Sequence, residues 1–227
     1  MNAVVYYSNT GQSRAVAEYL GKQLCYPAFE MESCGNVRFN NLVLVFPVYC
    51  QNIPDLVKTF LDKADIVNLT AVATYGKMCY GNVLYEIQHR YRKNIVAGAY
   101  IPTKHSYIAD DEAFSDFGSL APLIEKINNP SEIAVPKEYK NPFANLLPKL
   151  RSCLGLKISK NTNCNGCGIC TELCSYKAIE AGNINGKCIR CLKCVNSCPN
   201  NALTFKVNMP LKLYLQKKKV NKLIIYV

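Results

Sequence analysis

Residues 1–128 alternate between two hydrophobic patterns. Some runs are apolar at nearly every position, which predicts buried β-strands, and others repeat apolar residues every three to four positions, which predicts amphipathic helices. The predicted strands are residues 2–8, 29–33, 42–48, 68–75 and 94–101, and the predicted helices are residues 12–25, 53–64, 83–93 and 111–128. Strands and helices in strict alternation indicate an α/β domain with a five-stranded, doubly wound parallel sheet covered on both faces.

The pattern changes after residue 128 and predicts three further segments. Residues 129–158 are rich in proline and predict an irregular connector, with a short helix near residues 142–150. Residues 159–208 form a cysteine-rich domain in which residues 203–207 predict a strand. Residues 209–227 alternate basic and apolar residues, and the sequence leaves open whether this tail pairs with a sheet.

Eight cysteines in the third segment form two runs of identical spacing, C-x2-C-x2-C-x3-C. The first run is Cys164, Cys167, Cys170 and Cys174, and the second is Cys188, Cys191, Cys194 and Cys198, followed by Pro199. In two-cluster bacterial ferredoxins with this spacing, three cysteines of each run bind one [4Fe–4S] cluster and the fourth binds the other cluster. We therefore predict that Cys198 completes the cluster of the first run and that Cys174 completes the cluster of the second. A zinc site and a disulfide scaffold are disfavoured by this spacing.

The two cysteine runs form an internal repeat, in which Cys164 corresponds to Cys188 and Cys174 to Cys198. Ala178-Ile179 corresponds to Ala202-Leu203, so an apolar pair follows each run at the same offset. The repeat is broken at Ser175, which stands where the second run has Pro199. This exchange loosens one corner of the repeat and removes no ligand.

The loop after the first predicted strand has the composition of a phosphate-binding site. It reads Ser8, Asn9, Thr10, Gly11, Gln12, Ser13 and leads directly into a helix. Hydroxyl groups and the amides of a helix N-terminus both donate hydrogen bonds to phosphate oxygens. The loop lacks the lysine of a P-loop and is not GxGxxG. An ordinary helix cap is the alternative.

Two further loops follow predicted strands at the same edge of the sheet, where ligands bind in such folds. Their candidate flavin-binding residues are Pro47, Val48, Tyr49, Cys50 and Asn52 in one loop, and Thr74, Tyr75, Gly76, Tyr80, Gly81 and Asn82 in the other. Aromatic side chains can stack on a flat isoalloxazine, and main-chain groups can bond to its edge. The alternative is that these tyrosines are turn residues. His105, in the loop after the fifth strand, is a further candidate neighbour.

Charge and composition narrow the class of protein. The net charge is +11, and residues 149–227 hold 14 of the 27 basic residues but two of the 16 acidic ones. This basic segment predicts an acidic, ferredoxin-like redox partner. Nucleic acid is disfavoured because the basic run at residues 217–219 lacks interleaved aromatic residues. No apolar run is long enough for a membrane span, and no signal peptide is evident, so we expect a cytoplasmic protein.

Residues 1–128 resemble a short-chain flavodoxin. The stretches 46–49, 74–76 and 80–82, together with the cysteine runs, resemble the ferrodoxins, anaerobe proteins that fuse a flavodoxin domain to a small α+β bacterial-type ferredoxin domain. The resemblance implies FMN, two [4Fe–4S] clusters and electron transfer between them. An alternative is a flavin-dependent reductase of a small molecule, fed by the clusters, with Tyr49, Tyr75, Tyr80 and His105 as candidate proton donors. A third is a binding module whose basic tail docks a complex.

Overall fold

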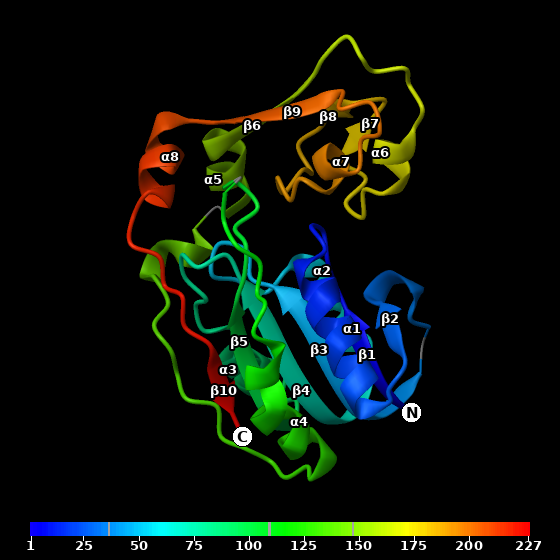
Figure 1. The fold of residues 1–227 in the computed structure, drawn as a ribbon, viewed down its shortest axis with the longest axis vertical. Coiled ribbons are helices and arrows are strands. Elements are labelled where there is room, and N and C mark those ends of the chain that lie inside the picture. The colour runs from blue at the N-terminus through cyan, green and yellow to red at the C-terminus, as the bar shows by residue number, and fades with distance from the viewer. Residues whose placement is uncertain (36, 109, 147) are drawn as a thin grey trace. The chain divides into compact units, whose positions relative to one another are not determined.

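The computed structural model describes residues 1–35, 37–108, 110–146 and 148–227, without the side chains of residues 148–151 (Figure 1). The chain forms two compact units. Unit 1 comprises Met1–His105, Asp110–Ala144 and Lys219–Val227, and unit 2 comprises Ser106–Ala109 and Asn145–Lys218. Among the helices described, none has the length and apolar character needed to cross a membrane.

Unit 1 is built on a six-stranded sheet. Its strands are β1 (Asn2–Tyr6), β2 (Ala28–Glu30), β3 (Arg38–Pro47), β4 (Asp65–Tyr75), β5 (Ile95–Pro102) and β10 (Ile224–Tyr226). The first five are parallel in the order β2-β1-β3-β4-β5, which is the flavodoxin-like order, and the predicted doubly wound sheet is thereby confirmed. The sixth strand, β10, pairs antiparallel with β5 and was not predicted.

Helices cover both faces of this sheet. They are α1 (Gln12–Leu24), α2 (Asp55–Lys63), α3 (Val83–Arg90) and α4 (Ala121–Asn128), with short 3₁₀ turns η1 (Met31–Ser33) and η2 (Phe117–Leu120). One core joins α1 and α4 to a sheet face through Val16, Leu20, Leu123, Val43 and Val72. Figure 1 shows α1 and α4 in front of the strands.

The predicted fourth helix begins later than the sequence indicates. Residues 111–116 are not helical, and the turn η2 precedes α4. The reason is Asp111, whose buried side chain bonds to Lys77 and Lys219 rather than pointing to solvent from a helix surface. The helix prediction for residues 111–116 is therefore wrong.

Unit 2 contains two small antiparallel ladders with short helices. Its elements are α5 (Pro148–Gly155), β6 (Leu156–Lys160), α6 (Ile169–Glu172), β7 (Ile179–Glu180), β8 (Asn183–Ile184), α7 (Lys193–Asn196), β9 (Leu203–Val207) and α8 (Met209–Leu215). Strand β6 pairs with β9, and β7 pairs with β8. The predicted strand at residues 203–207 is confirmed. The offset that aligns the two cysteine runs also carries α6 onto α7 and the start of β7 onto the start of β9, so the sequence repeat is a structural repeat.

The boundaries of the units differ from those expected from composition. The predicted connector contains the 3₁₀ turn η3 (Pro142–Asn145), the helix α5 and the start of β6. The predicted tail is divided, because α8 belongs to unit 2 whereas Lys219–Val227 returns to unit 1.

Candidate cluster and flavin sites

The backbone of each cysteine run turns tightly before its short helix. Gly166 and Gly168 have φ angles of 75° and 80°, and their equivalents in the second run, Arg190 and Leu192, have φ angles of 62° and 64°. Left-handed residues at these positions turn the chain back within a short distance, and glycine adopts them without steric cost. The two loops therefore share one conformation although only the first has glycines.

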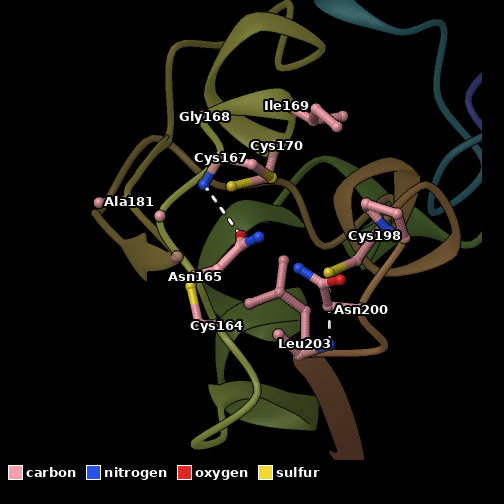
Figure 2. A pocket seen from close by; sticks show the side chains of 14 residues that line it. Cys164, Asn165, Cys167, Gly168, Ile169, Cys170, Ala181, Cys198, Asn200 and Leu203 are labelled. Carbon is pink, nitrogen blue, oxygen red and sulfur yellow. Dashed lines mark hydrogen bonds between the residues drawn. The ribbon is translucent and has the colours of Figure 1, made fainter.

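A hollow in unit 2 is lined by four of the predicted ligands. Cys164, Cys167 and Cys170 come from the first run and Cys198 comes from the second. Figure 2 shows Cys198 across the hollow from Cys164. Residues with small or apolar side chains also line it: Gly166, Gly168, Ile169, Ala181, Gly182, Ala202 and Leu203. The hollow thus brings together the set of cysteines that the sequence predicts for one cluster.

The other four cysteines also lie near one another. Burial, together with the nearby thiols of Cys191, Cys188, Cys174 and Cys170, raises the pKa of the Cys194 thiol to about 12. Burial likewise raises the pKa of Cys191 to about 11, with Cys188 and Cys174 among its charged neighbours. Crowded thiols resist ionisation unless a cation offsets their charge, and a metal cluster supplies that charge.

Main-chain amides point at several cysteine sulfurs. The amide of Ala178 donates to Sγ of Cys174 and the amide of Ala202 donates to Sγ of Cys198, both at 3.3 Å. These two bonds are equivalent under the repeat. The amide of Arg190 donates to Sγ of Cys188 at 3.4 Å. Such bonds stabilise thiolate ligands and tune cluster potentials, so the donor set fits iron–sulfur clusters. Within the described ranges, no three His, Cys, Asp or Glu side chains gather as around a single metal ion.

The first candidate flavin loop has two features that suit a phosphate. Gly11 caps α1 with a φ of 85°, and a Cβ atom there would meet nothing within 4 Å, so the space beside the loop is open. The hydroxyl of Ser8 is buried and finds no hydrogen-bond partner in the part of the chain described. A buried hydroxyl without a partner is costly, and a phosphate oxygen would satisfy it.

Other side chains of this loop are held by protein partners. The Ser13 and Thr74 hydroxyls share a hydrogen bond of 2.8 Å, and Gln12 Oε1 accepts from Thr103 at 2.6 Å. Asn9 Nδ2 donates to the Tyr49 hydroxyl at 2.6 Å and so links the first two candidate loops. These side chains set the shape of the loop, whereas Ser8, Thr10 and the first amides of α1 remain as candidate donors to a phosphate.

The second candidate loop makes a strained turn. Cys50 and Gln51 have φ angles of 49° and 65°, where glycine would be favoured. The side-chain carboxamide of Asn52 is already hydrogen-bonded within the protein. Its Nδ2 donates to the carbonyls of Cys50 and Ala144, and its Oδ1 accepts from Lys140. Pro47 and Val48 follow directly from β3, and the Val48 amide donates to the Thr74 carbonyl at 2.8 Å, which joins this loop to the third.

The aromatic residues of the third loop pack inward. Tyr75 is 1% exposed, and its hydroxyl donates to the carbonyl of Lys222 at 2.6 Å. The Tyr80 ring lies 5.2 Å from that of Tyr75 and its hydroxyl donates to Glu138 at 3.3 Å. Burial raises the pKa of Tyr75 to about 12. Of the three candidate tyrosines, Tyr75 is thus part of the protein core.

Glycine and asparagine residues give the third loop its close packing. A Cβ atom on Gly76 would lie 2.6 Å from the His105 ring, and one on Gly81 would lie 2.6 Å from the carbonyl oxygen of Gln51. The Asn82 carboxamide oxygen accepts from the Glu138 amide at 2.8 Å. His105 thus lies against the third loop.

A buried ion-pair group beside this loop was missed by the sequence analysis. Asp111 accepts from Lys77 at 3.2 Å, from Lys219 at 2.7 Å and from the His105 amide at 2.8 Å. Burial by itself would raise the pKa of Asp111, but the bonds from Lys219, His105 and Lys77 lower it to about 2. The carboxylate is therefore charged. Lys219 and Asp111 lie far apart in the sequence, so no local pattern could have revealed the pair.

Comparisons with known proteins gave one family match and several similar solved structures. A 4Fe-4S binding domain family (Fer4) matches residues 184–204, which contain the second cysteine run. The comparison with curated proteins gave no match. Among solved structures, the chain is similar to "a flavodoxin from the domain Archaea" (16% identity, TM-score 0.41, 56% of this chain and 99% of that chain).

Two further solved structures show similarities of the same size. One is a short-chain flavodoxin associated with a non-canonical PDU bacterial microcompartment (17% identity, TM-score 0.43, 56% of this chain and 96% of that chain). The other is a putative flavoprotein from Bacteroides uniformis ATCC 8492 (17% identity, TM-score 0.39, 46% of this chain and 91% of that chain). The strand order, and not these similarities, defines the flavodoxin-like fold.

The chain is therefore a flavodoxin-like unit joined to a ferredoxin-type unit. This combination supports electron transfer that uses a flavin and a 4Fe-4S centre.

Proposed function

We propose that this protein is an electron-transfer flavo-iron–sulfur protein with FMN in unit 1 and two [4Fe–4S] clusters in unit 2. The observation that carries the proposal is the hollow lined by Cys164, Cys167, Cys170 and Cys198. Three of these cysteines belong to one run and the fourth to the other, which is the combination that a two-cluster site with exchanged ligands requires.

The second cluster is proposed from the remaining four cysteines. Cys174, Cys188, Cys191 and Cys194 are close enough for their charges to interact. Amides directed at Cys174 and Cys188 support the same role, because they stabilise thiolate sulfur. The match of residues 184–204 to a 4Fe-4S binding domain adds support for the second run.

FMN is proposed for unit 1 because one phosphate can be accommodated at one loop. The Ser8 hydroxyl, the Thr10 side chain and the first amides of α1 would bind the phosphate, and Gly11 leaves open space there. The loops beginning at Pro47 and Thr74 follow β3 and β4 and would position the flavin ring. The sequence contains no GxGxxG motif for a second nucleotide.

The proposed activity is a relay within one chain. An iron–sulfur cluster exchanges single electrons and FMN takes one or two, so a protein that holds both can connect one-electron and two-electron reactions. Joining the two units gives each a high effective concentration near the other. None of the 13 cysteines, all within the described ranges, forms a disulfide bond, and with clusters of this type we propose a reducing, oxygen-poor compartment such as the cytoplasm of an anaerobe.

A reductase that acts on a small molecule is the less supported function. It needs a proton donor beside the flavin, and three of the four candidate residues do not supply one. Tyr75 donates to Lys222 and Tyr80 to Glu138. Burial lowers the pKa of His105 to about 4, so this residue is neutral near pH 7 and carries no proton to give as an imidazolium.

Rapid mixing with a one-electron reductant tests the relay. The anaerobic, fully loaded protein is mixed with substoichiometric dithionite, and cluster and flavin absorbance are followed separately. The proposal predicts that the clusters are reduced first and that flavin reduction follows at a rate independent of protein concentration, because transfer is intramolecular. A rate of flavin reduction proportional to protein concentration would contradict the relay.

A further inference from the structure

Two buried polar atoms of unit 2 have no protein partner. They are Oγ of Ser175 and Nη1 of Arg190, and neither has a hydrogen bond within the described parts of the chain. A buried donor without a partner is destabilising, and more so when it carries a charge. Both atoms can donate, so each calls for an acceptor that the polypeptide does not provide.

Both donors belong to the neighbourhood of one proposed cluster. Ser175 directly follows Cys174, and Arg190 directly precedes Cys191. The Arg190 amide also donates to Sγ of Cys188. Cys174, Cys188 and Cys191 are three of the four cysteines proposed for the second cluster.

The internal repeat indicates where these two side chains lie relative to that cluster. It makes Arg190 equivalent to Gly166 and Ser175 equivalent to Pro199. Gly166 and Pro199 both line the hollow of the first cluster. Neither has a side chain that can donate a hydrogen bond. The second cluster therefore has two donors at positions that lack donors at the first.

Arg190 is held in place against its backbone preference. Its φ of 62° is easily adopted by glycine, the residue at the equivalent position of the first run, and is unfavourable for residues with a Cβ atom. The guanidinium Nε donates to the carbonyl of Leu156 at 3.1 Å. The Tyr107 hydroxyl donates to the Arg190 carbonyl at 2.8 Å. The bond from Nε fixes the direction of the side chain, and the bond from Tyr107 holds the main chain, while Nη1 stays unpaired.

We propose that Arg190 and Ser175 donate hydrogen bonds to sulfur atoms of the cluster bound by Cys174, Cys188, Cys191 and Cys194. Reduction adds one electron to a cluster, and hydrogen bonds and a nearby positive charge stabilise the more negative reduced form. This cluster therefore has the higher reduction potential and accepts an electron before the cluster bound by Cys164, Cys167, Cys170 and Cys198. The inference rests on the two-cluster proposal and adds the order in which the two clusters of the relay accept electrons.

The repeat supplies the variants that test this order. Arg190→Gly and Ser175→Pro each copy the residue of the first run, and glycine suits the left-handed backbone at position 190. Lys187→Ala is the matched control, because it removes an exposed positive charge next to Cys188 and leaves both buried donors in place. Ser175→Ala removes the hydroxyl group without imposing a proline backbone.

Anaerobic redox titration with dithionite, followed by electron paramagnetic resonance, measures the two midpoint potentials. We expect two distinct midpoints in the wild type. In Arg190→Gly, Ser175→Pro and Ser175→Ala the higher midpoint potential becomes more negative, while the lower midpoint potential stays unchanged. The change is largest in the variant that combines Arg190→Gly with Ser175→Ala. Lys187→Ala changes it less than Arg190→Gly does.

The outcomes separate this inference from the function on which it rests. About eight irons per chain, with midpoints that do not move in these variants, overturn the inference and leave the two clusters intact. A shift of the lower midpoint potential instead of the higher one also overturns the inference. About four irons per wild-type chain overturn both the inference and the two-cluster proposal.

Discussion

Asn161 and Asn185 occupy equivalent positions of the repeat and make the same set of hydrogen bonds. The amide of Asn161 donates to Ala202 and that of Asn185 to Ala178, both at 2.9 Å. Each carboxamide oxygen accepts at 2.9 Å from a main-chain amide just beyond it, that of Asn163 or Lys187. Each carboxamide nitrogen donates to a carbonyl of the opposite half, that of Asn201 for Asn161 (3.1 Å) and that of Lys177 for Asn185 (3.2 Å). The two asparagines thus tie each cysteine loop to the other half of the repeat.

Removing one of these side chains should weaken one cluster more than the other. Asn161→Ala loses bonds beside the loop of Cys164, and Asn185→Ala loses those beside Cys188. Each side chain makes two bonds, so at about 1 kcal/mol per lost bond we expect roughly thirtyfold faster loss of the nearer cluster to an iron chelator. Bleaching kinetics measure this rate, and electron paramagnetic resonance identifies the remaining cluster. Asn163→Ala is the control, since Asn163 joins the turn through its main-chain amide. Equal loss of both clusters in each variant would contradict the prediction that each asparagine stabilises the cluster beside its own loop.

Ser8→Ala should affect the flavin-free and the flavin-bound protein in opposite directions. It removes a buried hydroxyl without a partner, so the free energy of unfolding of the flavin-free protein should rise by about 1 kcal/mol. It also removes a donor to the phosphate, so FMN should bind roughly 10–100-fold more weakly, whereas riboflavin affinity stays unchanged. Flavin fluorescence titrations measure both affinities.

Ser13→Ala is the matched control for this loop. The Ser13 hydroxyl is bonded to Thr74, so its removal should lower the stability of the flavin-free protein. A Ser8→Ala variant that loses riboflavin and FMN affinity to the same extent would show that Ser8 does not face the phosphate.

His105 should make stability depend on pH between about 6.5 and 4. An unfolded histidine takes up a proton near pH 6.5, while burial lowers the pKa of folded His105 to about 4. Below pH 6.5 the unfolded state therefore binds more protons, and stability falls as the pH drops, by up to about 3 kcal/mol at pH 4. Above pH 6.5 the residue contributes no pH dependence.

Urea unfolding at pH 7 and pH 5 measures this effect. His105→Gln should reduce the loss of stability between the two pH values. His89→Gln should behave like the wild type, because His89 is exposed and is the other histidine of the chain. An unchanged loss in His105→Gln would assign the pH dependence to other groups.

The exposed lysines of unit 2 should accelerate reduction by an acidic protein partner. Lys212, Lys217 and Lys218 are exposed, whereas Lys219 is left unchanged in the test because it bonds to Asp111. Changing the three exposed lysines to glutamate should slow reduction by an acidic ferredoxin at low salt, and the difference should shrink above roughly 0.1 M salt. Stopped-flow measurements across ionic strength give the rates, with dithionite reduction as the control. Reduction rates independent of salt in both the wild type and the triple variant would remove the support for an acidic partner.

The sequence predicted the features that depend on local spacing. The buried stretches of β1, β3 and β5 are apolar at nearly every position, and the spacing within each cysteine run defines its loop. The grouping of Cys198 with the first run came from the ferredoxin pattern, and these four cysteines line one hollow in unit 2.

The features that were missed depend on contacts between distant segments. Strand β10 is short, and it pairs with β5 because the chain returns to unit 1 after α8. The inward direction of Asp111 depends on Lys77 and Lys219, which are far from it in sequence. Tyr75 looked like a ring available to a flavin, but its hydroxyl is bound by the same returning segment. Periodicity carries no information about such partners.

The most direct test of the account is the iron, sulfide and zinc content of anaerobically purified protein. Two clusters, each bound by four cysteines, predict about eight irons and about eight acid-labile sulfides per chain. Cys198→Ala should lower the iron content by up to about four and spare the cluster of Cys188, Cys191, Cys194 and Cys174. Stoichiometric zinc in place of iron, or loss of the latter cluster in Cys198→Ala, would contradict the account.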